Sequence, residues 1–433
     1  MSTHSLTDAV EAAKQRYTEA NPTSKALHEE ATLSLPGGNT RTVLHAGPFP
    51  IYMKSGKNHQ VISEDGKTYT DLLCEFTAAL YGHSNPRLQE AITNVVQTIG
   101  MNVGANTRQE TLFAREVCSR FALERVRFAN SGTEANLHAL AAARLFTGKH
   151  KVVSFSGGYH GGVLGFRGGA PAKNNVDKQD WVVARYNDLE SAKAAIKTEG
   201  VAAVIVEGMQ GAGGCFAGTI DFLRGVQEAA HDAGVLFILD EVMTSRLSSG
   251  GLAQMYGLKP DLKTFGKWLG GGLAIGAFGG RADIMAAFDP RLSTSVAHSG
   301  TFNNNTLVTH AGYTGLKELY TSSEAERFTQ VGEALRAKLN EVSSGTRMCF
   351  TGLGTIMAVH ITKCGTREIL RASDVEEDQV MMELFWFEMI EQGFWLAKRG
   401  FVALILETPQ EELDRFVGAV ATFVGKYRSE LSL

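Results

Sequence analysis

The sequence predicts an α/β fold in which a large domain holds a mainly parallel sheet and a smaller α+β domain completes the chain. Short apolar segments alternate with helical segments through the middle of the chain, as is typical of parallel sheets. Residues 201–206 are apolar and rich in β-branched side chains, as expected of a strand buried on both faces. Polar residues follow several of these strands, at the edge where open α/β sheets bind ligands.

The middle of the chain is predicted to alternate strands with helices. The strands are expected at residues 126–129, 151–155, 181–184, 201–206, 235–239 and 262–265. One helix opens at residues 130–135 and continues through residue 145, and another covers residues 221–233.

The two ends of the chain have a different pattern. Helical spacing runs over residues 7–35 and stops at Pro36-Gly37-Gly38, residues 51–73 alternate like short strands, and helices follow at residues 86–100 and 108–121. Beyond the alternating region we expect mostly helix at 306–344, two strands around Gly352 within 348–361, a helix at 376–392, a strand at 399–406 and a helix at 410–427. We assign residues 1–60 and 321–433 to the small domain and residues 61–320 to the large domain.

Composition narrows the function classes. The chain has 433 residues, a net charge of −4 and no long basic run, which argues against nucleic acid as a partner. No apolar stretch reaches the ~18 residues expected of a membrane span, and the polar N-terminus lacks the apolar core of a signal peptide. The five cysteines are scattered without a CxxC or Cys/His cluster, so we expect no metal site and a cytoplasmic protein.

Lys267 stands in an unusual setting, the stretch DLKTFGKWLGGGL. Glycines on both sides let a ligand approach the backbone closely because they have no Cβ. A lysine placed in this way is suited to form a Schiff base with an aldehyde cofactor. An ordinary lysine in a glycine-rich turn is the alternative.

Two other strand ends carry candidate binding residues. Ser131, Gly132 and Thr133 open a helix, whose free N–H groups suit a phosphate, although Ser131 could simply cap the helix. Tyr159, followed by His160 after a glycine turn, could stack on a flat heteroaromatic ring or pack over the sheet edge.

Two carboxylates end neighbouring strands. Asp240 follows an apolar strand, and a carboxylate buried there needs a partner, which could be a protonated pyridine nitrogen, a helix start or Arg246. Glu207 could supply further hydrogen bonds to a ligand or cap a turn.

The order of these elements is more specific than any one of them. The motifs NSGTEA, GGYHGG, LDEVMTSR and TFGKWLGGG occur in sequence, with 27 residues from Asp240 to Lys267. The chain resembles the fold-type I pyridoxal-phosphate (PLP) enzymes, and within them the class III aminotransferases, over nearly its whole length. It departs from them at Gly208, where the family usually has proline after the glutamate.

The resemblance implies a role for each residue. Lys267 would hold PLP as a Schiff base and then shuttle a proton, and Asp240 would pair with the pyridinium nitrogen. Tyr159 and Val242 would lie on opposite faces of the ring, with His160 and Glu207 also in the cofactor site. The phosphate would be held by Ser131, Gly132 and Thr133, and by Thr301 of a neighbouring subunit, so that a homodimer shares its active sites.

Arginines are the candidates for substrate recognition, because a guanidinium can grip a carboxylate with two hydrogen bonds. Arg41 lies in GGNTRTVLH and Arg399 precedes GF. The first stretch, with EFTAALYGHS, SGGYHGGVLGF and HSGTFNNN, resembles the β-amino-acid (β-phenylalanine) aminotransferases. In that group the matching arginines bind the β-carboxylate of the donor and the α-carboxylate of the acceptor; surface arginines are the alternative, and Lys398 adds a charge beside Arg399.

The predicted reaction is therefore a ping-pong transfer of an amino group from a β-amino acid or amine to a keto acid such as 2-oxoglutarate or pyruvate. Glutamate-1-semialdehyde 2,1-aminomutase is the alternative, but the loop GGVLGFRGGAPAKNN does not resemble the gating loop of that enzyme. A racemase of the same class is a third possibility. A binding protein without activity is disfavoured because the lysine and the aspartate are both present.

Overall fold

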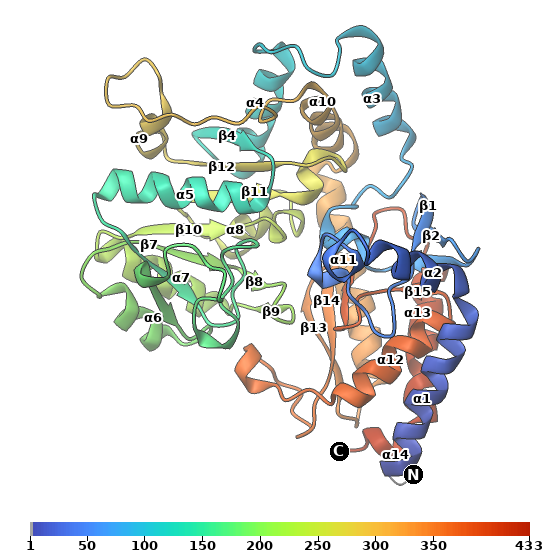
Figure 1. Cartoon of the computed structure of the whole chain (residues 1–433). Helices are drawn as coiled ribbons and strands as arrows, with labels where there is room; N and C mark the ends of the chain where they lie inside the picture. The colour runs from blue at the N-terminus through green and yellow to red at the C-terminus, as the bar shows by residue number, and fades with distance from the viewer. Residues whose placement is uncertain (1–2) are drawn as a thin grey trace.

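The structure, a computed structural model, describes residues 3–433, and its largest sheet has seven strands (Figure 1). The strand order is β4 (Arg125–Ala129), β12 (Gly276–Gly280), β11 (Leu262–Gly266), β10 (Leu236–Asp240), β7 (Val201–Glu207), β5 (Lys151–Phe155) and β6 (Trp181–Ala184). The strands from β11 to β6 run parallel, whereas β12 is antiparallel to both of its neighbours. The predicted α/β fold with a mainly parallel sheet is confirmed.

Strand β12 is the member of this sheet that the sequence pattern does not predict. Three of its five residues are glycine, a residue that weakens strands. Close neighbours explain two of them, because a Cβ at Gly276 would lie 2.0 Å from the Ser131 carbonyl oxygen and one at Gly280 would lie 2.0 Å from the Asp261 carbonyl oxygen. The glycines therefore serve close backbone packing and not a turn.

Alternate residues of the central strands enter two separate hydrophobic clusters. Ala203 and Ile205 of β7 pack in the cluster that holds α5 (Gly132–Thr147). Val204 and Val206 pack in the cluster that holds α6 (Leu189–Ile196) and α7 (Ile220–Asp232). The sheet is thus covered on both faces, which accounts for the uninterrupted apolar run of β7.

Polar caps start most of the helices that surround the sheet. A side-chain oxygen accepts a first-turn N–H at Asn85 for α3 (Pro86–Thr98), Thr107 for α4 (Arg108–Phe121), Ser131 for α5, Asp188 for α6 and Thr219 for α7. Such caps satisfy donors that a helix leaves unpaired, so these helices begin where the sequence places a cap.

The N-terminal helical region is divided in two. Helix α1 (Thr3–Ala20) ends before Asn21, and α2 (Pro22–Ala31) begins with proline. The sequence pattern predicted continuous helical spacing over residues 7–35, which misses this break. Proline lacks an N–H and disfavours helix at the preceding residue, so the break falls at Asn21.

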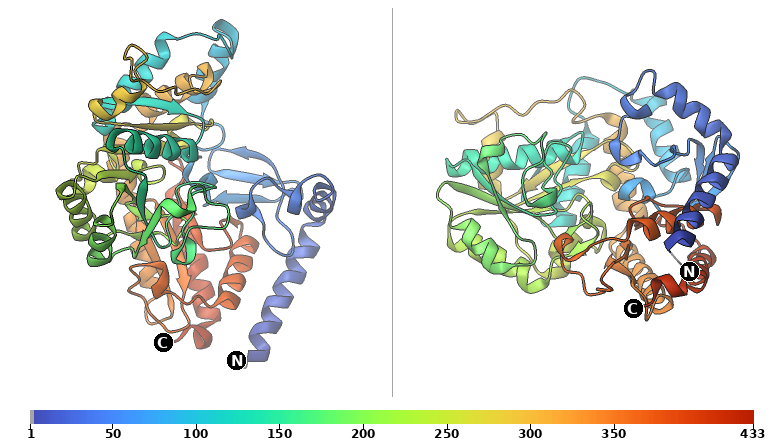
Figure 2. Two further views of the ribbon diagram at one scale, coloured as in Figure 1. Left: turned by 60° about the vertical axis from the view of Figure 1, so that its left-hand side comes forward. Right: turned by 60° about the horizontal axis from the view of Figure 1, so that its bottom comes forward.

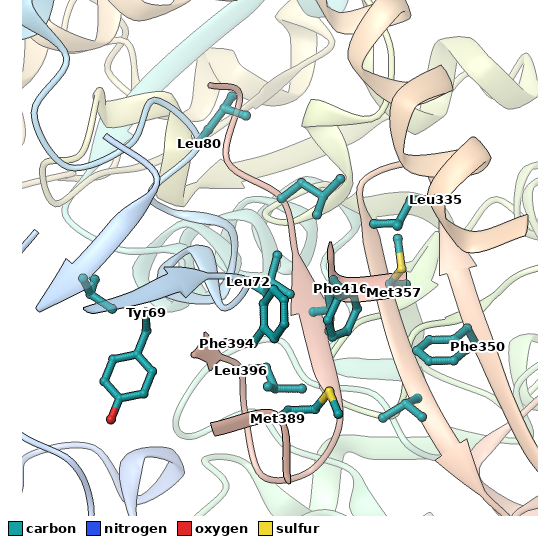
Figure 3. Packing of buried hydrophobic residues seen from close by; sticks show 14 of the residues in the cluster. Tyr69, Leu72, Leu80, Leu335, Phe350, Met357, Met389, Phe394, Leu396 and Phe416 are labelled. Carbon is teal, nitrogen blue, oxygen red and sulfur yellow. The ribbon is translucent and has the colours of Figure 1, made fainter. Parts of the chain in front are cut away.

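The two ends of the chain pack together beside the large sheet (Figure 2), and α1 contacts α12 (Gln379–Glu391). A four-stranded sheet joins β1 (Met53–Lys57), β2 (Gln60–Ser63) and β3 (Thr68–Asp71) to β15 (Phe394–Trp395), and a three-stranded sheet contains β13 (Met348–Leu353), β14 (Ile356–Ile361) and β16 (Phe401–Ala403). Helices α11 (Ser322–Val342) and α13 (Gln410–Lys426) complete this part. Figure 3 shows Leu72 of the N-terminal part close to Phe394 and Leu396 of the C-terminal part.

Three details of this part differ from the sequence prediction. The reversal between β13 and β14 lies at Gly354 and Thr355, where Gly354 adopts φ 52°, and Gly352 lies within β13. The predicted strand at 399–406 is limited to β16, and the helix predicted from residue 376 starts at Gln379 after an Asp378 cap. The domain boundaries at residues 60 and 320 stay a prediction.

Shorter elements connect these layers. They are β8 (Met209–Gln210), β9 (Phe216–Ala217), α8 (Gly251–Tyr256), α9 (Ala282–Met285), α10 (Thr306–Thr314), a π-helical turn (Gly315–Leu319) and α14 (Arg428–Leu431). Helix α10 packs against α3 and α4. Among residues 3–433, no helix is long and apolar enough to cross a bilayer.

Arg246 links the large sheet region to the C-terminal part. Its side chain is fully buried, donates to the Leu404 carbonyl oxygen at 2.5 Å and lies over the Phe328 ring. The Tyr320 hydroxyl donates to its backbone carbonyl at 2.7 Å. Loss of any one of these partners would leave a buried polar group without a hydrogen bond and would lower the stability of the fold.

We expect Arg246→Ala to lower the free energy of unfolding by roughly 2–4 kcal/mol, because it leaves a void and an unpaired buried carbonyl. Chemical denaturation followed by circular dichroism measures this. Arg291→Ala is the control, since Arg291 is exposed and pairs only with Asp289 among the described residues. Equal midpoints for the two variants would contradict the structural role of Arg246.

Candidate active site

Lys267 lies directly after β11, at the carboxyl edge of the parallel strands. It adopts φ 57°, a conformation uncommon for residues other than glycine. The preceding Gly266 is tightly enclosed, since a Cβ there would lie 3.3 Å from the Gly132 nitrogen, at the start of α5. The lysine therefore lies where the carboxyl end of β11 meets the start of α5.

The side chain of Lys267 is partly buried. Its Nζ donates to the Phe76 carbonyl oxygen at 2.9 Å. Burial lowers the pKa of Lys267 to about 8, and the carboxylates of Asp240 and Glu207 oppose the shift. A substantial fraction of neutral amine is thus present near neutral pH, as a nucleophile or proton acceptor requires.

Asp240 is buried at the end of β10, the strand beside β11. Its Oδ2 accepts from Asn136 Nδ2 at 2.8 Å and lies 2.8 Å from His160 Nδ1, and its Oδ1 accepts from the Val242 N–H at 3.0 Å. Arg246, the alternative partner that the sequence suggests, donates to Leu404 instead. The carboxylate is thereby fixed in place by neutral donors and by one titratable ring.

Asn136 is a site residue that sequence reasoning missed. It lies on α5, donates to both Asp240 and the His160 carbonyl oxygen, and accepts from the Thr264 hydroxyl at 2.6 Å. The available signal was an amide side chain within an otherwise alanine-rich helix, four residues after Gly132. Its importance comes from contacts with residues far away in the sequence.

Glu207 ends β7 and ties two loops to the sheet. Its carboxylate accepts from the Tyr159 N–H at 2.8 Å and from the Gly211 N–H at 3.2 Å. Burial raises the pKa of Glu207 to about 7; nearby His160 opposes this shift, while Asp240 adds to it. The departure at Gly208 also has a local reason, since a Cβ there would lie 2.4 Å from the Leu252 side chain.

Tyr159 and His160 point to different surroundings. His160 is buried against Asp240, whereas 46% of Tyr159 is exposed. The Tyr159 ring is therefore available to cover a ligand, and not packed beneath the sheet edge. The two residues are held by the Glu207 bond and by the His160 N–H, which donates to the Leu164 carbonyl oxygen at 2.8 Å.

The start of α5 has both of the features that the sequence left open. The Ser131 hydroxyl accepts from the Glu134 N–H at 3.1 Å, so it does cap the helix. The N–H groups of Gly132 and Thr133 belong to the first turn, where intrahelical partners are missing. A Cβ at Gly132 would lie 2.9 Å from the Val242 side chain, which places Val242 against this helix start.

Thr301 is the predicted site residue that the structure does not bring to the others. It is exposed, and no hydrogen bond within residues 3–433 joins it to the residues around Lys267. Its neighbour Asn303 accepts from Asn130 Nδ2 at 3.0 Å, so the segment lies near the end of β4.

The two predicted substrate arginines meet on one aromatic ring. The guanidinium carbons of Arg41 and Arg399 lie 5.5 and 5.6 Å from the centre of the Phe76 ring. The backbone carbonyl of the same Phe76 accepts the hydrogen bond from Lys267 Nζ. Arg41 forms an ion pair with Glu75, and Arg399 donates to the Ala212 carbonyl oxygen at 2.7 Å.

Phe76 is the second residue that sequence reasoning missed. It lies in the Cys74–Thr77 turn, where four consecutive residues have φ between 46° and 81°. A run of left-handed residues other than glycine is costly, and such strain is found mostly at functional sites. Sequence spacing shows neither the turn nor its contacts, because both depend on the folded arrangement.

These residues can hold a cofactor that combines an aldehyde, an aromatic ring and a phosphate. The partly neutral Lys267 amine suits the aldehyde, Asp240 suits a protonated ring nitrogen, and the start of α5 suits the phosphate. No group of three or more His, Cys, Asp or Glu side chains within residues 3–433 is arranged to hold a metal ion.

Comparison with known proteins supports this chemistry. The class-III aminotransferase family matches residues 43–406. A β-phenylalanine transaminase of Variovorax paradoxus is 44% identical over 429 residues, 98% of this chain and 98% of that protein. A glutamate-1-semialdehyde 2,1-aminomutase of Pelotomaculum thermopropionicum is 33% identical over 417 residues, 90% of this chain and 95% of that protein.

The solved structures give the same result. A crystal structure of a β-phenylalanine aminotransferase from V. paradoxus superposes with a TM-score of 0.95 at 43% identity, covering 99% of both chains. The fold is therefore that of the PLP-dependent transferases, and the family match spans most of the sequence. This chain belongs to the class-III aminotransferase family and is a PLP-dependent transaminase.

Proposed function

We propose that this transaminase takes an amino group from a β-amino acid and passes it to an α-keto acid such as 2-oxoglutarate or pyruvate. The observation that carries the proposal is the pair of guanidinium groups over the ring of Phe76, whose backbone carbonyl accepts a hydrogen bond from Lys267 Nζ. The 44% identity to a β-phenylalanine transaminase supports the same donor class.

Two arginines account for two kinds of substrate. The carboxylate of a β-amino acid lies one carbon further from the reacting carbon than that of an α-keto acid. One guanidinium cannot grip both carboxylates while the reacting carbon stays at Lys267, because bidentate contacts fix the geometry. Arg41 is therefore assigned to the donor carboxylate and Arg399 to the acceptor carboxylate.

The remaining residues are assigned to the cofactor and to proton transfer. Bound PLP supplies an aldehyde that condenses with amines and a ring that withdraws electrons from the carbon bearing nitrogen. Ser131, Gly132 and Thr133 would hold the phosphate, and Asp240 would keep the ring nitrogen protonated. The Lys267 amine would remove the proton from the substrate carbon that bears the nitrogen. It would then deliver this proton to the cofactor carbon that carried the aldehyde.

The aromatic loop and Glu207 would complete the cofactor site. Tyr159 and Val242 would lie on the two faces of the ring. His160 would hold the Asp240 carboxylate in position, and Glu207 would hold the loop that carries Tyr159. The existing hydrogen bonds of both residues support these roles.

We also infer a homodimer whose partner supplies Thr301 to the phosphate. An apolar patch supports it, because large hydrophobic side chains at Ile99, Met101, Val103 and Phe302 are 42–55% exposed. The Thr306 hydroxyl donates to the Met101 carbonyl oxygen at 2.9 Å and so joins the two segments of the patch. Five free cysteines support a cytoplasmic location.

We expect the cofactor-free enzyme to capture PLP at a rate that rises with pH up to about 8 and then levels off. Only the neutral amine attacks an aldehyde, so each pH unit below 8 slows capture about tenfold. Visible absorbance after rapid mixing measures the rate. Lys267→Ala should show no covalent capture of PLP, whereas Lys193→Ala, at an exposed lysine, should keep the wild-type rate. A capture rate that does not change with pH would contradict the assignment of Lys267.

For the arginines we expect a separation by substrate. Arg41→Ala should raise the KM for β-phenylalanine roughly 10- to 100-fold, and Arg399→Ala should do the same for 2-oxoglutarate, because each removes a charged hydrogen bond. Steady-state kinetics with both substrates varied gives the two constants for each variant.

Arg185→Ala is the control for this experiment, because Arg185 is exposed and pairs with Asp188 on the surface. If each variant raised the KM for both β-phenylalanine and 2-oxoglutarate, the two arginines would have a purely structural role. Omitting the keto acid should stop the reaction after one half-turnover, whereas an aminomutase would continue.

For the homodimer, Met101→Asp combined with Phe302→Asp should convert the protein to monomers, since charges would enter the buried centre of the contact. Light scattering after size-exclusion chromatography reports the mass. Val380→Asp, on an exposed apolar residue outside the patch, should stay dimeric. A wild-type monomer would refute the shared active site.

A further inference from the structure

Arg41 is already occupied by a carboxylate of the protein itself. Its guanidinium forms an ion pair with Glu75, and among the described residues this is the guanidinium's only hydrogen-bonding partner. Arg399 differs, because it donates to the Ala212 carbonyl oxygen and not to a carboxylate. Before any substrate binds, the charge of Arg41 is therefore paired with a carboxylate, whereas Arg399 bonds a neutral backbone carbonyl.

Glu75 is held in a way that presents its carboxylate to Arg41. It lies in the left-handed Cys74–Thr77 turn with φ 46°. The turn is anchored by Asp71, whose Oδ1 accepts the N–H groups of Leu73 and Cys74 at 2.7 and 2.9 Å. A strained turn that surrounding bonds keep in place indicates that the position of its side chains matters.

The ion pair is exposed enough to be exchanged. The side chains of Arg41 and Glu75 are 42% and 49% exposed. Exposed pairs contribute little net stability, and the Arg41–Glu75 contact runs through a single nitrogen–oxygen pair. A substrate carboxylate that binds with two hydrogen bonds can replace it.

A space also exists beside Glu75. A cavity of about 280 Å³ is lined by Glu75 together with Lys54, His83 and Asp71. Lys54 offers a cation there, whereas His83 is paired with Asp71 at 2.9 Å. When a substrate carboxylate binds Arg41, the Glu75 side chain can rotate toward this cavity, where the Lys54 ammonium can compensate its charge.

The geometry points to Glu75 as an internal competitor for the donor carboxylate at Arg41. This inference rests on the proposed function, because it needs Arg41 to bind the donor carboxylate. Glu75 neutralises the guanidinium in the free enzyme and yields it to a β-amino acid, so it weakens donor binding selectively. Acceptors held at Arg399 meet no such competitor.

The test compares Glu75→Gln with the wild-type holoenzyme. The amide keeps the size of the side chain and removes its charge, so the KM for β-phenylalanine should fall about threefold while the KM for 2-oxoglutarate stays the same. On the Arg41→Ala background, Glu75→Gln should change neither constant.

A binding measurement makes the test independent of turnover. The ligand 3-phenylpropanoate has the carboxylate but no amine and cannot react. By isothermal titration calorimetry, its Kd should fall about threefold in Glu75→Gln and remain at the weakened Arg41→Ala value in the double variant. Asp414→Asn, which removes the charge of another exposed ion pair, should match the wild type.

The outcomes separate two failures. If Glu75→Gln binds 3-phenylpropanoate with unchanged or weaker affinity, Glu75 only positions Arg41 and the inference is wrong. If no amino donor changes the absorbance of the holoenzyme, the proposed function is wrong. The binding experiment still decides whether Glu75 competes for carboxylates at Arg41.

Discussion

The need to satisfy one buried carboxylate controls how the large sheet and its covering helix fit together. Asp240 is 5% exposed, and a charge in such a place is tolerated only when donors surround it. Asn136 of α5 supplies one donor and is itself held by Thr264 of β11. A displacement of α5 along the sheet would break both bonds, so this network sets the register between the helix and two strands.

The same arrangement explains why the site is composed of distant segments. Lys267 follows a strand of the large sheet, but its hydrogen-bond acceptor Phe76 lies 191 residues earlier, and the two arginines come from the ends of the chain. Strand β15 pairs in parallel with β3 at Phe394 and Thr70, which places the segment leading to Arg399 next to the Cys74–Thr77 turn. Pairing of residues more than 300 positions apart thus assembles the substrate side of the site.

Much of this could be predicted because its causes are local. Strands β5 and β6 have the predicted bounds, since apolar runs and turn residues lie next to them in the sequence. Lys267, Asp240 and Glu207 could be proposed from the sequence because each ends or directly follows a recognisable strand. Asn136 and Phe76 were missed because their roles consist of contacts made across the fold, and β12 was missed because its glycines answer to neighbouring backbone. Thr301 is exposed and does not join the residues around Lys267 within this chain, so its assignment to the phosphate stays a prediction.

The position of β12 in the sheet has a consequence for the nascent chain. Strand β4 ends at Ala129, but its partner β12 begins only at Gly276 and separates β4 from β11. On the ribosome, the parallel strands β5, β7 and β10 can associate well before β4 has anything to pair with. Strand β4 therefore joins the sheet only after Lys267 has been synthesised, because Lys267 precedes β12 in the chain. Such long-range closure is slow, so the last strand to complete this sheet is an internal strand and not an edge strand.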